Sequence, residues 1–310
     1  MQLLKRKVMI CGANGLLGQN LLQAYHDEYD LIAVGSRPAP LVRRPNARYY
    51  QCDLTDHREV MELAKNTIPN LIINAAAFTD VDGSETQRER CWQVNATAVD
   101  YLAQAARRID ARIIHVSTDY VFDGSAGPYR EDDPPNPLGY YGKAKLAGEN
   151  AVISGGSDYA IARTMVLYGS GARIRLNFVT WLLNQLREKK PVRIVNDQFG
   201  NPTLASELAA ALQKLAESNE SGIFHLSGSE TIDRYCFALK VAEIFELDSQ
   251  LIAPITTAEL EQQAPRPMNA GFDVSKAKRQ LGIELSDASG GLKKFHAEMN
   301  CYEHANATLG

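Results

Sequence analysis

The sequence lacks an excess of charge of either sign. Its 310 residues include 33 lysines and arginines and 37 aspartates and glutamates, a formal net charge of −4. Because nucleic-acid binding needs a basic face, we expect no nucleic-acid partner. Long apolar runs are missing too, since none approaches the roughly 18 residues of a membrane span, and we expect no membrane association. The apolar run at 8–11 is also too short for the core of a signal peptide.

Cysteine and histidine are too scattered to suggest a metal centre. The six histidines are dispersed and no two cysteines form a CxxC pair, so we expect no metal site. His115 falls inside a predicted strand, where a packed core residue is more common than a ligand. Unclustered cysteines without an export signal are typical of reduced thiols, so we expect a cytoplasmic protein. The cysteines are Cys11, Cys52, Cys91, Cys236 and Cys301.

What the sequence does have is a glycine-rich stretch near its start, KVMICGANGLLGQNLL at 7–22. An apolar run suited to a buried strand precedes the glycines, and residues that favour a helix follow them. Such a turn presents backbone N–H groups and the positive end of a helix dipole to an anion. Gly12 would permit the tight turn, Gly15 the approach of a pyrophosphate, and Gly18 close packing of helix on strand. The stretch predicts a dinucleotide-binding fold, although a glycine loop without a ligand is the alternative.

The residues after the second predicted strand, Leu31–Val34, indicate which cofactor is preferred. Dinucleotide-binding folds usually place an acid here to hold ribose hydroxyls, whereas this chain has Ser36 and Arg37. A carboxylate would repel a 2′-phosphate and an arginine would bind one, so we expect NADPH, with NADH as a second option. The alternative for Arg37 is a solvated loop charge. Asp53, at the end of the third predicted strand, would either accept a hydrogen bond from adenine or cap the next helix.

A fourth predicted strand, Leu71–Ala77, is apolar throughout and ends in small residues that would let a cofactor approach the backbone. Capping-box spacing at 84–87 then predicts one helix to about Arg107, with Trp92 in its apolar stripe. Asn95 lies near that stripe. A buried asparagine needs hydrogen-bond partners, so Asn95 would either tie down backbone or order a water.

A fifth predicted strand, Arg112–Val116, leads directly into the hydroxyl residues Ser117 and Thr118. Open α/β sheets bind their ligands at the carboxyl ends of such strands. Tyr141 and Lys145 follow one turn apart on a predicted helix, so they share a face. Such a pair is common by chance, and its value comes from the Ser-Thr strand end before it.

The alternation of strands and helices predicts an α/β protein with a doubly wound, Rossmann-type parallel sheet. We expect a cofactor-binding domain over 1–170, to which 203–228 returns, and a smaller α/β substrate-binding domain over 171–310. The sixth strand is predicted at Tyr159–Leu167. The tail after Phe295 is polar, and we expect it to be loosely held.

Six stretches resemble the extended short-chain dehydrogenase/reductases, and within them most closely the dTDP-4-dehydrorhamnose reductases. They follow in family order between residues 12 and 228. The stretches are GANGLLGQNL at 12–21, NAAAFTDVDGSE at 74–85, STDYVFDG at 117–124, YGKAKLAGE at 141–149, DQFGNPT at 197–203 and GIFHLSG at 222–228.

The resemblance implies reduction of a nucleotide-linked 4-ketosugar by NADPH or NADH, in this family dTDP-4-dehydro-L-rhamnose to dTDP-L-rhamnose. It implies the catalytic residues Thr118, Tyr141 and Lys145. Together with the positions argued above, the expected cofactor contacts are Gly12, Asn14, Gly15, Leu16, Leu17, Gly18, Ser36, Arg37, Asp53, Leu54, Ala75, Ala76, Ala77, Tyr141 and Lys145. The expected substrate contacts are Thr118, Asp119, Asn177, Gln198 and Arg266. A homodimer is one option for the assembly.

One departure from the family leaves the sugar open. The family usually has Arg-Thr-Ser-Trp after the sixth strand, whereas this chain has Arg-Thr-Met-Val at 163–166. Two alternatives therefore remain: another nucleotide-sugar reductase or epimerase, or a non-catalytic nucleotide-binding subunit. The regulatory subunit of methionine adenosyltransferase resembles the same branch.

The three implied catalytic residues suit the reduction of a ketone. Tyrosine is a weak acid, with a pKa of about 10, and a cation one turn away would lower that pKa. We therefore expect Tyr141 to supply the proton, Lys145 the charge and Thr118 a hydrogen bond to the carbonyl oxygen. Arg266, Arg173 and Arg175 would clamp the diphosphate, with solvated surface charge as the alternative for each.

Overall fold

The computed structural model describes residues 5–307, with side chains as far as 300. Its centre is a seven-stranded sheet in the order β11-β6-β5-β4-β1-β2-β3, and every pairing in it is parallel. The inner strands are buried on both faces, which accounts for their continuous apolar runs. The strands are β1 (Arg6–Cys11), β2 (Tyr29–Gly35), β3 (Ala47–Gln51), β4 (Leu71–Asn74), β5 (Arg112–Thr118), β6 (Tyr159–Thr164) and β11 (Gly222–His225).

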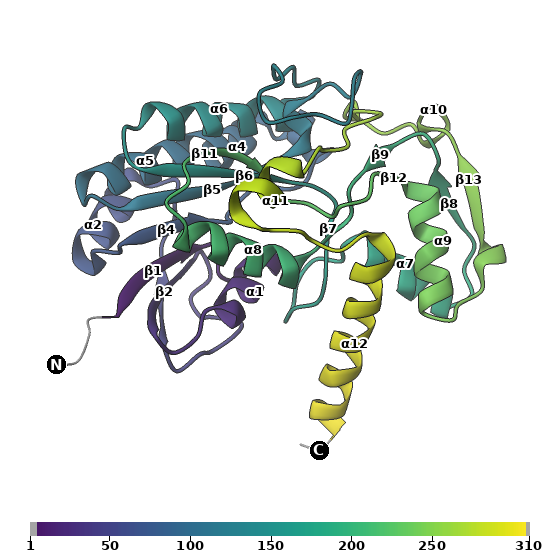
Figure 1. Ribbon diagram of the computed structural model, residues 1–310, viewed down its shortest axis with the longest axis horizontal. Coiled ribbons are helices and arrows are strands. Elements are labelled where there is room, and N and C mark those ends of the chain that lie inside the picture. Colours follow the sequence, from purple (N-terminus) through teal and green to yellow (C-terminus); the bar gives the residue numbers. More distant parts are fainter. Residues whose placement is uncertain (1–4, 308–310) are drawn as a thin grey trace.

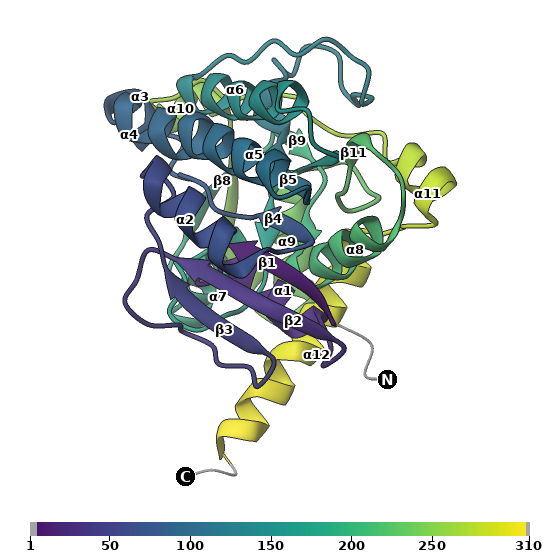
Figure 2. The same cartoon turned by 90° about the vertical axis from the view of Figure 1, so that its left-hand side faces the viewer.

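Helices cover both faces of this sheet (Figures 1 and 2). One apolar cluster joins the sheet to α1 (Leu16–Ala24), α8 (Ala205–Glu217) and α11 (Ser275–Leu281). A second cluster on the opposite face joins it to α2 (His57–Thr67), α5 (Ala98–Arg108) and α6 (Tyr140–Ser154). The doubly wound parallel sheet predicted from the sequence is confirmed.

The order of the strands reverses between β1 and β4, because the chain moves to β2 and β3 on one side before returning to β4 on the other. Ligands of doubly wound sheets bind at such a switch point, outside the carboxyl ends of the strands. The glycine loop follows β1 and the three alanines follow β4. The fold thus brings both predicted cofactor-binding segments to one crevice.

A smaller α/β region has an apolar core of its own, formed by three helices and a two-stranded parallel pair. Two short pairs of strands link this region to the main sheet (Figure 1). The predicted boundary at residue 170 stays a prediction. The elements are α7 (Phe178–Arg187), α9 (Arg234–Ile244), α12 (Ala288–Ala307), α10 (Thr257–Leu260), the pair β8 (Val192–Val195) with β13 (Ile252–Ile255), the parallel pair β7 (Leu167–Tyr168) with β10 (Thr203–Leu204), and the antiparallel pair β9 (Phe199–Gly200) with β12 (Ile232–Asp233).

The prediction of a single helix over 84–107 is wrong, because the helix is interrupted at two places. Gln87 leaves the helical region with φ −108° and ψ 46°, and a π-helical turn interrupts it again around Asn95. The amide of Asn95 holds both backbone groups of Phe78, at 2.8 and 2.9 Å, so it ties down backbone. The extra residue in the π turn shifts the helical register, and Trp92 is 41% exposed instead of packed. The pieces are α3 (Gly83–Thr86), α4 (Arg88–Trp92), η1 (Gln93–Thr97) and α5.

Two further predictions of secondary structure need correction. The sixth strand ends at Thr164 and not at Leu167, because Val166 takes a left-handed conformation with φ 47° and turns the chain toward β7. The polar tail after Phe295 continues as part of α12, where His296 packs on the Phe245 ring and Met299 packs against the apolar core of the smaller region. The side chains after residue 300, including that of Cys301, lie outside the described part.

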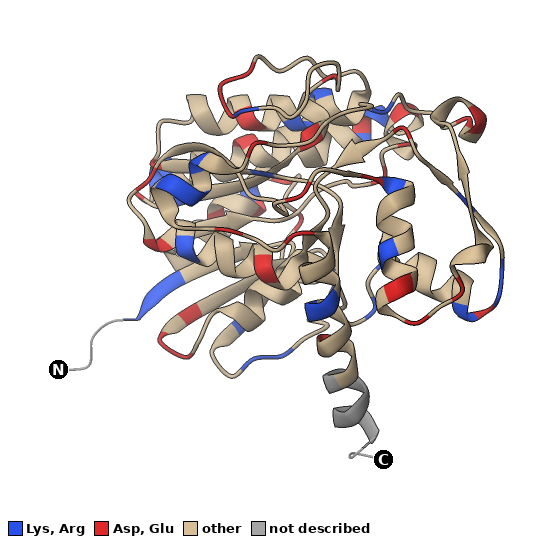
Figure 3. Ribbon diagram, turned by 45° about the vertical axis from the view of Figure 1, so that its right-hand side comes forward, with Lys and Arg blue, Asp and Glu red and all other residues tan. Residues whose placement is uncertain are grey.

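Charges of both signs alternate along the elements (Figure 3). Within residues 5–307, no helix is both long and apolar enough to cross a membrane. No three potential metal-binding His, Cys, Asp or Glu side chains gather in this part of the chain. The four cysteines whose side chains are described are free thiols, three of them buried and Cys236 exposed.

Candidate active site

The glycine loop after β1 has the shape that a pyrophosphate needs. Gly12 has φ +81°, and a Cβ there would lie 2.7 Å from the Ala76 nitrogen, so a larger residue would strain the turn and press on the strand end after β4. A Cβ on Gly18 would overlap the Gly12 carbonyl oxygen. Gly15 is the N-cap of α1 and supplies no side-chain hydrogen bond, so the first turn of the helix stays open to an anion. The loop therefore fits a dinucleotide, whose phosphates would contact the N–H groups of Leu16 and Leu17.

Asn14 connects this loop to the segment after β2. Its Oδ1 accepts from the Leu41 backbone N–H at 2.8 Å, and its Nδ2 donates to the Tyr49 hydroxyl at 3.1 Å. Tyr49 in turn donates to the Arg37 carbonyl oxygen at 2.7 Å. Asn14 therefore positions the Ser36–Arg37 segment in addition to any contact of its own with the cofactor.

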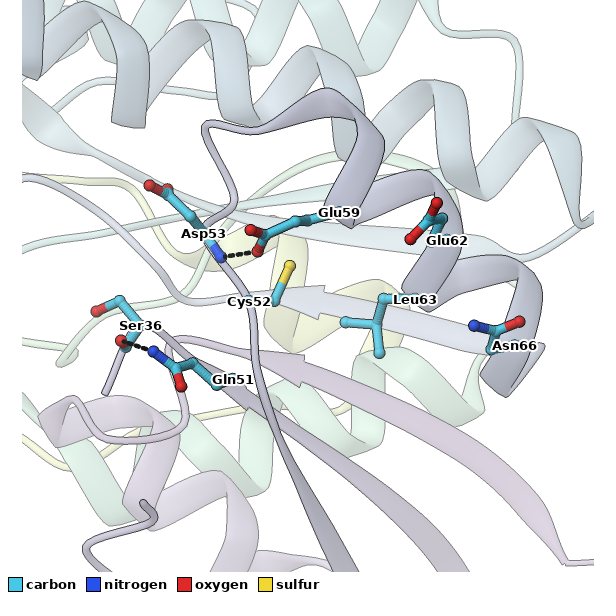
Figure 4. A pocket seen from close by; sticks show the side chains of 8 residues that line it. All are labelled: Ser36, Gln51, Cys52, Asp53, Glu59, Glu62, Leu63 and Asn66. Atoms are coloured by element: carbon cyan, nitrogen blue, oxygen red, sulfur yellow. Dashed lines mark hydrogen bonds between the residues drawn. The ribbon is translucent and has the colours of Figure 1, made fainter. Parts of the chain in front are cut away.

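Ser36 lies at an open pocket of about 650 Å³ between the end of β2, the end of β3 and α2 (Figure 4). Asp53 also lines the pocket, and its carboxylate accepts from the Thr55 N–H and hydroxyl, which lowers its pKa. Asp56, and not Asp53, caps α2. Leu54 is half-buried in the core beside this pocket. The capping alternative for Asp53 is therefore wrong.

The three alanines that follow β4 lie next to the glycine loop after β1. The Ala75 N–H donates to the Cys11 carbonyl at 3.1 Å, and the Ala76 N–H donates to the side chain of Asn74 at 3.1 Å. Ala75, Ala76 and Ala77 are half-buried. With no side chain beyond Cβ, these residues leave room above the strand end.

Thr118, Asp119 and Tyr141 meet at the carboxyl end of β5. All three are buried, with 6–8% of each residue exposed. The Thr118 hydroxyl donates to Asp119 Oδ1 at 2.9 Å and accepts from the Tyr120 N–H at 3.3 Å. Burial raises the pKa of Asp119 to about 6. Thr118 can therefore donate to a carbonyl oxygen only after turning its single proton away from Asp119.

The pKa of Tyr141 is raised and not lowered, because burial and then the charge of Asp119 outweigh the Thr118 hydroxyl, which acts in the opposite direction. The effect of Lys145 on this pKa stays a prediction. Lys145 is 2% exposed, and its Nζ donates to the Val116 carbonyl oxygen at 2.7 Å. Burial lowers the pKa of Lys145 to about 8. Tyr141 thus keeps its proton at neutral pH, as a general acid must.

The predicted substrate residues are mostly occupied by structural bonds. Asn177 caps α7, accepting from the Thr180 N–H at 3.1 Å and donating to the Gly169 carbonyl at 2.7 Å. Gln198 donates to the Thr257 hydroxyl at 3.0 Å and to Gln262 Oε1 at 2.9 Å. Of the side-chain amide groups of these two residues, Gln198 Oε1 makes no hydrogen bond with the described residues, so the role of both in substrate binding stays a prediction.

Two of the three predicted phosphate clamps form ion pairs with aspartates. Arg266 donates to Asp82 at 2.8 Å with only 8% of its side chain exposed, and its guanidinium lies 5.9 Å from the centre of the Tyr120 ring. Arg175 is exposed and pairs with Asp80 at 3.8 Å. Arg173 is exposed. Arg266 is therefore the one of the three that the fold fixes near the strand end of β5.

Comparison with known proteins now identifies the family. The model of the RmlD substrate binding domain matches residues 6–301. This chain belongs to the RmlD family. The dTDP-4-dehydrorhamnose reductase of Aggregatibacter actinomycetemcomitans is 33% identical over 305 residues, which cover 94% of this chain and 98% of that protein.

Two other RmlD relatives bear on function. The crystal structure of dTDP-4-dehydrorhamnose reductase from Bacillus anthracis in complex with NADP superposes with a TM-score of 0.86 at 29% identity, covering 95% of this chain and 100% of that one. The methionine adenosyltransferase 2 subunit beta of Bos taurus is 35% identical over 284 residues, which cover 90% of this chain and 83% of that protein. This chain is thus similar both to dTDP-4-dehydrorhamnose reductases and to a protein named as a subunit of methionine adenosyltransferase 2.

Arg234 is a candidate site residue of this RmlD family member that was not expected from the sequence. Its guanidinium lies 5.7 Å from the centre of the Phe178 ring and makes no hydrogen bond or salt bridge with the described residues. Its charge lowers the pKa of Asp119 and Tyr120, so it lies near the strand end of β5. A signal existed: Arg234 is the first residue of α9, where the helix dipole disfavours a cation. A locally unfavourable residue often has a tertiary role.

Proposed function

We propose that this protein is an NADPH-dependent reductase of a nucleotide-linked 4-ketosugar, with dTDP-4-dehydro-L-rhamnose as substrate and dTDP-L-rhamnose as product. One observation carries the proposal: Tyr141 and Thr118 are buried together at the strand end of β5. That strand end lies in the same sheet, on the same edge, as the glycine loop after β1. The identity to named dTDP-4-dehydrorhamnose reductases supports the choice of sugar.

The bound cofactor would supply the hydride to the ketone carbon. Tyr141 donates its proton to the oxygen that becomes an alkoxide, and the raised pKa keeps that proton in place until then. Thr118 turns from Asp119 to hydrogen-bond the same oxygen. Arg234 and Arg266 hold the diphosphate of the nucleotide sugar, since charge-assisted bonds to phosphate are the strong ones.

The direct test follows NADPH absorbance with a small panel of nucleotide 4-ketosugars. We expect the fastest oxidation of NADPH with dTDP-4-dehydro-L-rhamnose. Faster reduction of another member of the panel would point to a different sugar. A different sugar is compatible with Val166, which stands where the family usually has a tryptophan. Tight binding of NADPH without reduction of any sugar would contradict the proposal.

A second function, a non-catalytic nucleotide-binding subunit, is supported by the 35% identity to methionine adenosyltransferase 2 subunit beta. It predicts that NADPH binds and that no sugar is reduced. The same absorbance assay, combined with a binding measurement, therefore separates the two functions.

We expect NADPH to bind at least about 10-fold more tightly than NADH, because a charge-assisted bond from Arg37 to the 2′-phosphate is worth about 1.5–3 kcal/mol. Arg37 is exposed, which favours the lower end of that range. Arg37→Ala should reduce the preference several-fold. Arg48→Ala, an exposed arginine on β3, is the matched control. Equal dissociation constants for both cofactors in the wild type would contradict the assignment.

Arg234→Met should raise KM for the nucleotide sugar by about 10- to 100-fold and change kcat much less. The reason is that a charge-assisted bond to the diphosphate is lost in the ground state and the transition state alike. Steady-state kinetics with saturating NADPH measure the effect. Arg187→Met, at an exposed position in the last turn of α7, should change neither constant. An unchanged KM would remove Arg234 from the substrate site.

A further inference from the structure

Three buried side chains form a hydrogen-bonded chain beneath the proposed catalytic centre. Asn74 and His115 are direct partners on the neighbouring strands β4 and β5. Asn74 Nδ2 lies 3.1 Å from His115 Nδ1, and His115 Nε2 lies 3.2 Å from Lys145 Nζ. None of the three is more than 2% exposed. His115 is packed in the core, as expected from the sequence, and its two hydrogen-bond partners give it a further role.

The backbone of Ala76 fixes which nitrogen of His115 carries the proton. The Ala76 N–H donates to Asn74 Oδ1 at 3.1 Å, and a peptide N–H cannot accept a bond, so the amide of Asn74 has only one workable orientation. Its Nδ2 must then donate to His115 Nδ1. Complete burial, the largest cause, holds the pKa of His115 well below its usual range, so the ring is neutral. The proton of His115 therefore lies on Nε2 and faces Lys145.

An ammonium group on Lys145 has only donors and no lone pair, so it could not accept a hydrogen bond from this N–H of His115. An uncharged amine resolves the conflict, because its lone pair accepts from His115 Nε2 while one of its own N–H groups donates to the Val116 carbonyl oxygen at 2.7 Å. The burial that lowers the pKa of Lys145 to about 8 acts in the same direction.

We propose that His115 is a positioning residue that favours the uncharged form of Lys145 in the unliganded protein, so that Lys145 gains a proton as the nicotinamide cofactor binds. This inference rests on the proposed binding of that cofactor. Once charged, Lys145 can stabilise the phenolate that Tyr141 leaves after donating its proton. Above a pH of about 8 the free protein thus avoids an unshared buried charge, which arises when the cofactor binds.

Other ionisable groups around Lys145 also affect its protonation. On α6, Glu149 follows one turn later and raises the pKa of Lys145, and Tyr141 precedes it by one turn. Cys91 on α4 is a thiol whose own pKa is raised by burial. Arg163 on β6 pairs with Glu149 at 2.7 Å, which weakens the effect of Glu149 on Lys145. His115 is the neighbour that opposes the ammonium by hydrogen-bond geometry.

The first test measures protons taken up when NADPH binds. Calorimetry at pH 8 in buffers of different ionisation enthalpy should show uptake of about half a proton by the wild type, as expected for a group with a pKa of about 8 that is charged in the complex. In His115→Leu the uptake should fall to less than half of that value, because Lys145 already holds its proton. His115→Gln, which keeps an N–H donor, should restore part of it. His26→Leu, at an exposed position, is the control and should match the wild type.

Absence of proton uptake in the wild type, or equal uptake in His115→Leu, overturns the inference. A second measurement does not depend on the variant folding or on the proposed function. In ¹⁵N-histidine-labelled wild type without cofactor, the His115 signal should show a protonated Nε2 and an unprotonated Nδ1. The opposite tautomer would refute the inference even if NADPH binds and the sugar is reduced. Conversely, loss of the proposed function leaves this readout intact.

Discussion

Replacement of Tyr141 by phenylalanine is expected to lower turnover by at least about 100-fold while leaving NADPH affinity nearly unchanged. The phenol is a buried acid beside Thr118, and Asp119, the second buried acid there, accepts a hydrogen bond from the Thr118 hydroxyl. Removal of the hydroxyl therefore takes away the proton donor without changing the ring that packs against Tyr120 at 5.3 Å.

Tyr140→Phe is the matched control for this substitution. Tyr140 is the preceding residue on α6, is half-buried and has an alanine, not a lysine, four residues later. We expect its turnover to stay close to that of the wild type. Near wild-type turnover of Tyr141→Phe would exclude Tyr141 as the acid, and fluorescence titration with NADPH would show whether cofactor binding had been disturbed instead.

Arg163→Met is expected to destabilise the protein by about 3–5 kcal/mol, because it leaves Glu149 as an unpaired buried charge. The two side chains form a bidentate pair at 2.9 and 2.7 Å, with 3% and 1% of them exposed. A change of this size should lower Tm by on the order of 10 °C. Thermal unfolding followed by circular dichroism measures it.

Two further variants test the reason for this loss. The double variant Arg163→Met with Glu149→Leu should recover most of the stability, because apolar side chains can replace a buried ion pair at little cost. Arg58→Met removes an exposed pair with Glu62 and should leave Tm unchanged. A double variant no more stable than Arg163→Met alone would mean that the packing of Arg163 on Phe122, and not its charge, stabilises the fold.

The sequence by itself determined the features that depend on local backbone chemistry. The spacing of Gly12, Gly15 and Gly18 predicted a turn that only glycine fits, and the structure shows a left-handed residue at Gly12 and no room for a side chain at Gly18. Continuous apolar runs predicted the buried parallel strands, since a strand covered on both faces has no polar side. The one-turn spacing of Tyr141 and Lys145 placed both on α6.

Only the tertiary structure decided which groups meet across the fold. Asn74, His115 and Lys145 come from three elements, and the hydrogen bonds that set the protonation of Lys145 exist only after β4, β5 and α6 pack together. The sequence did not show that Asp82 pairs with Arg266 whereas Arg234 has no ion-pair partner among the described residues. Contacts between residues far apart along the chain leave no periodic signal. Their protonation and pairing therefore follow from packing, because burial makes every unmatched charge or donor costly.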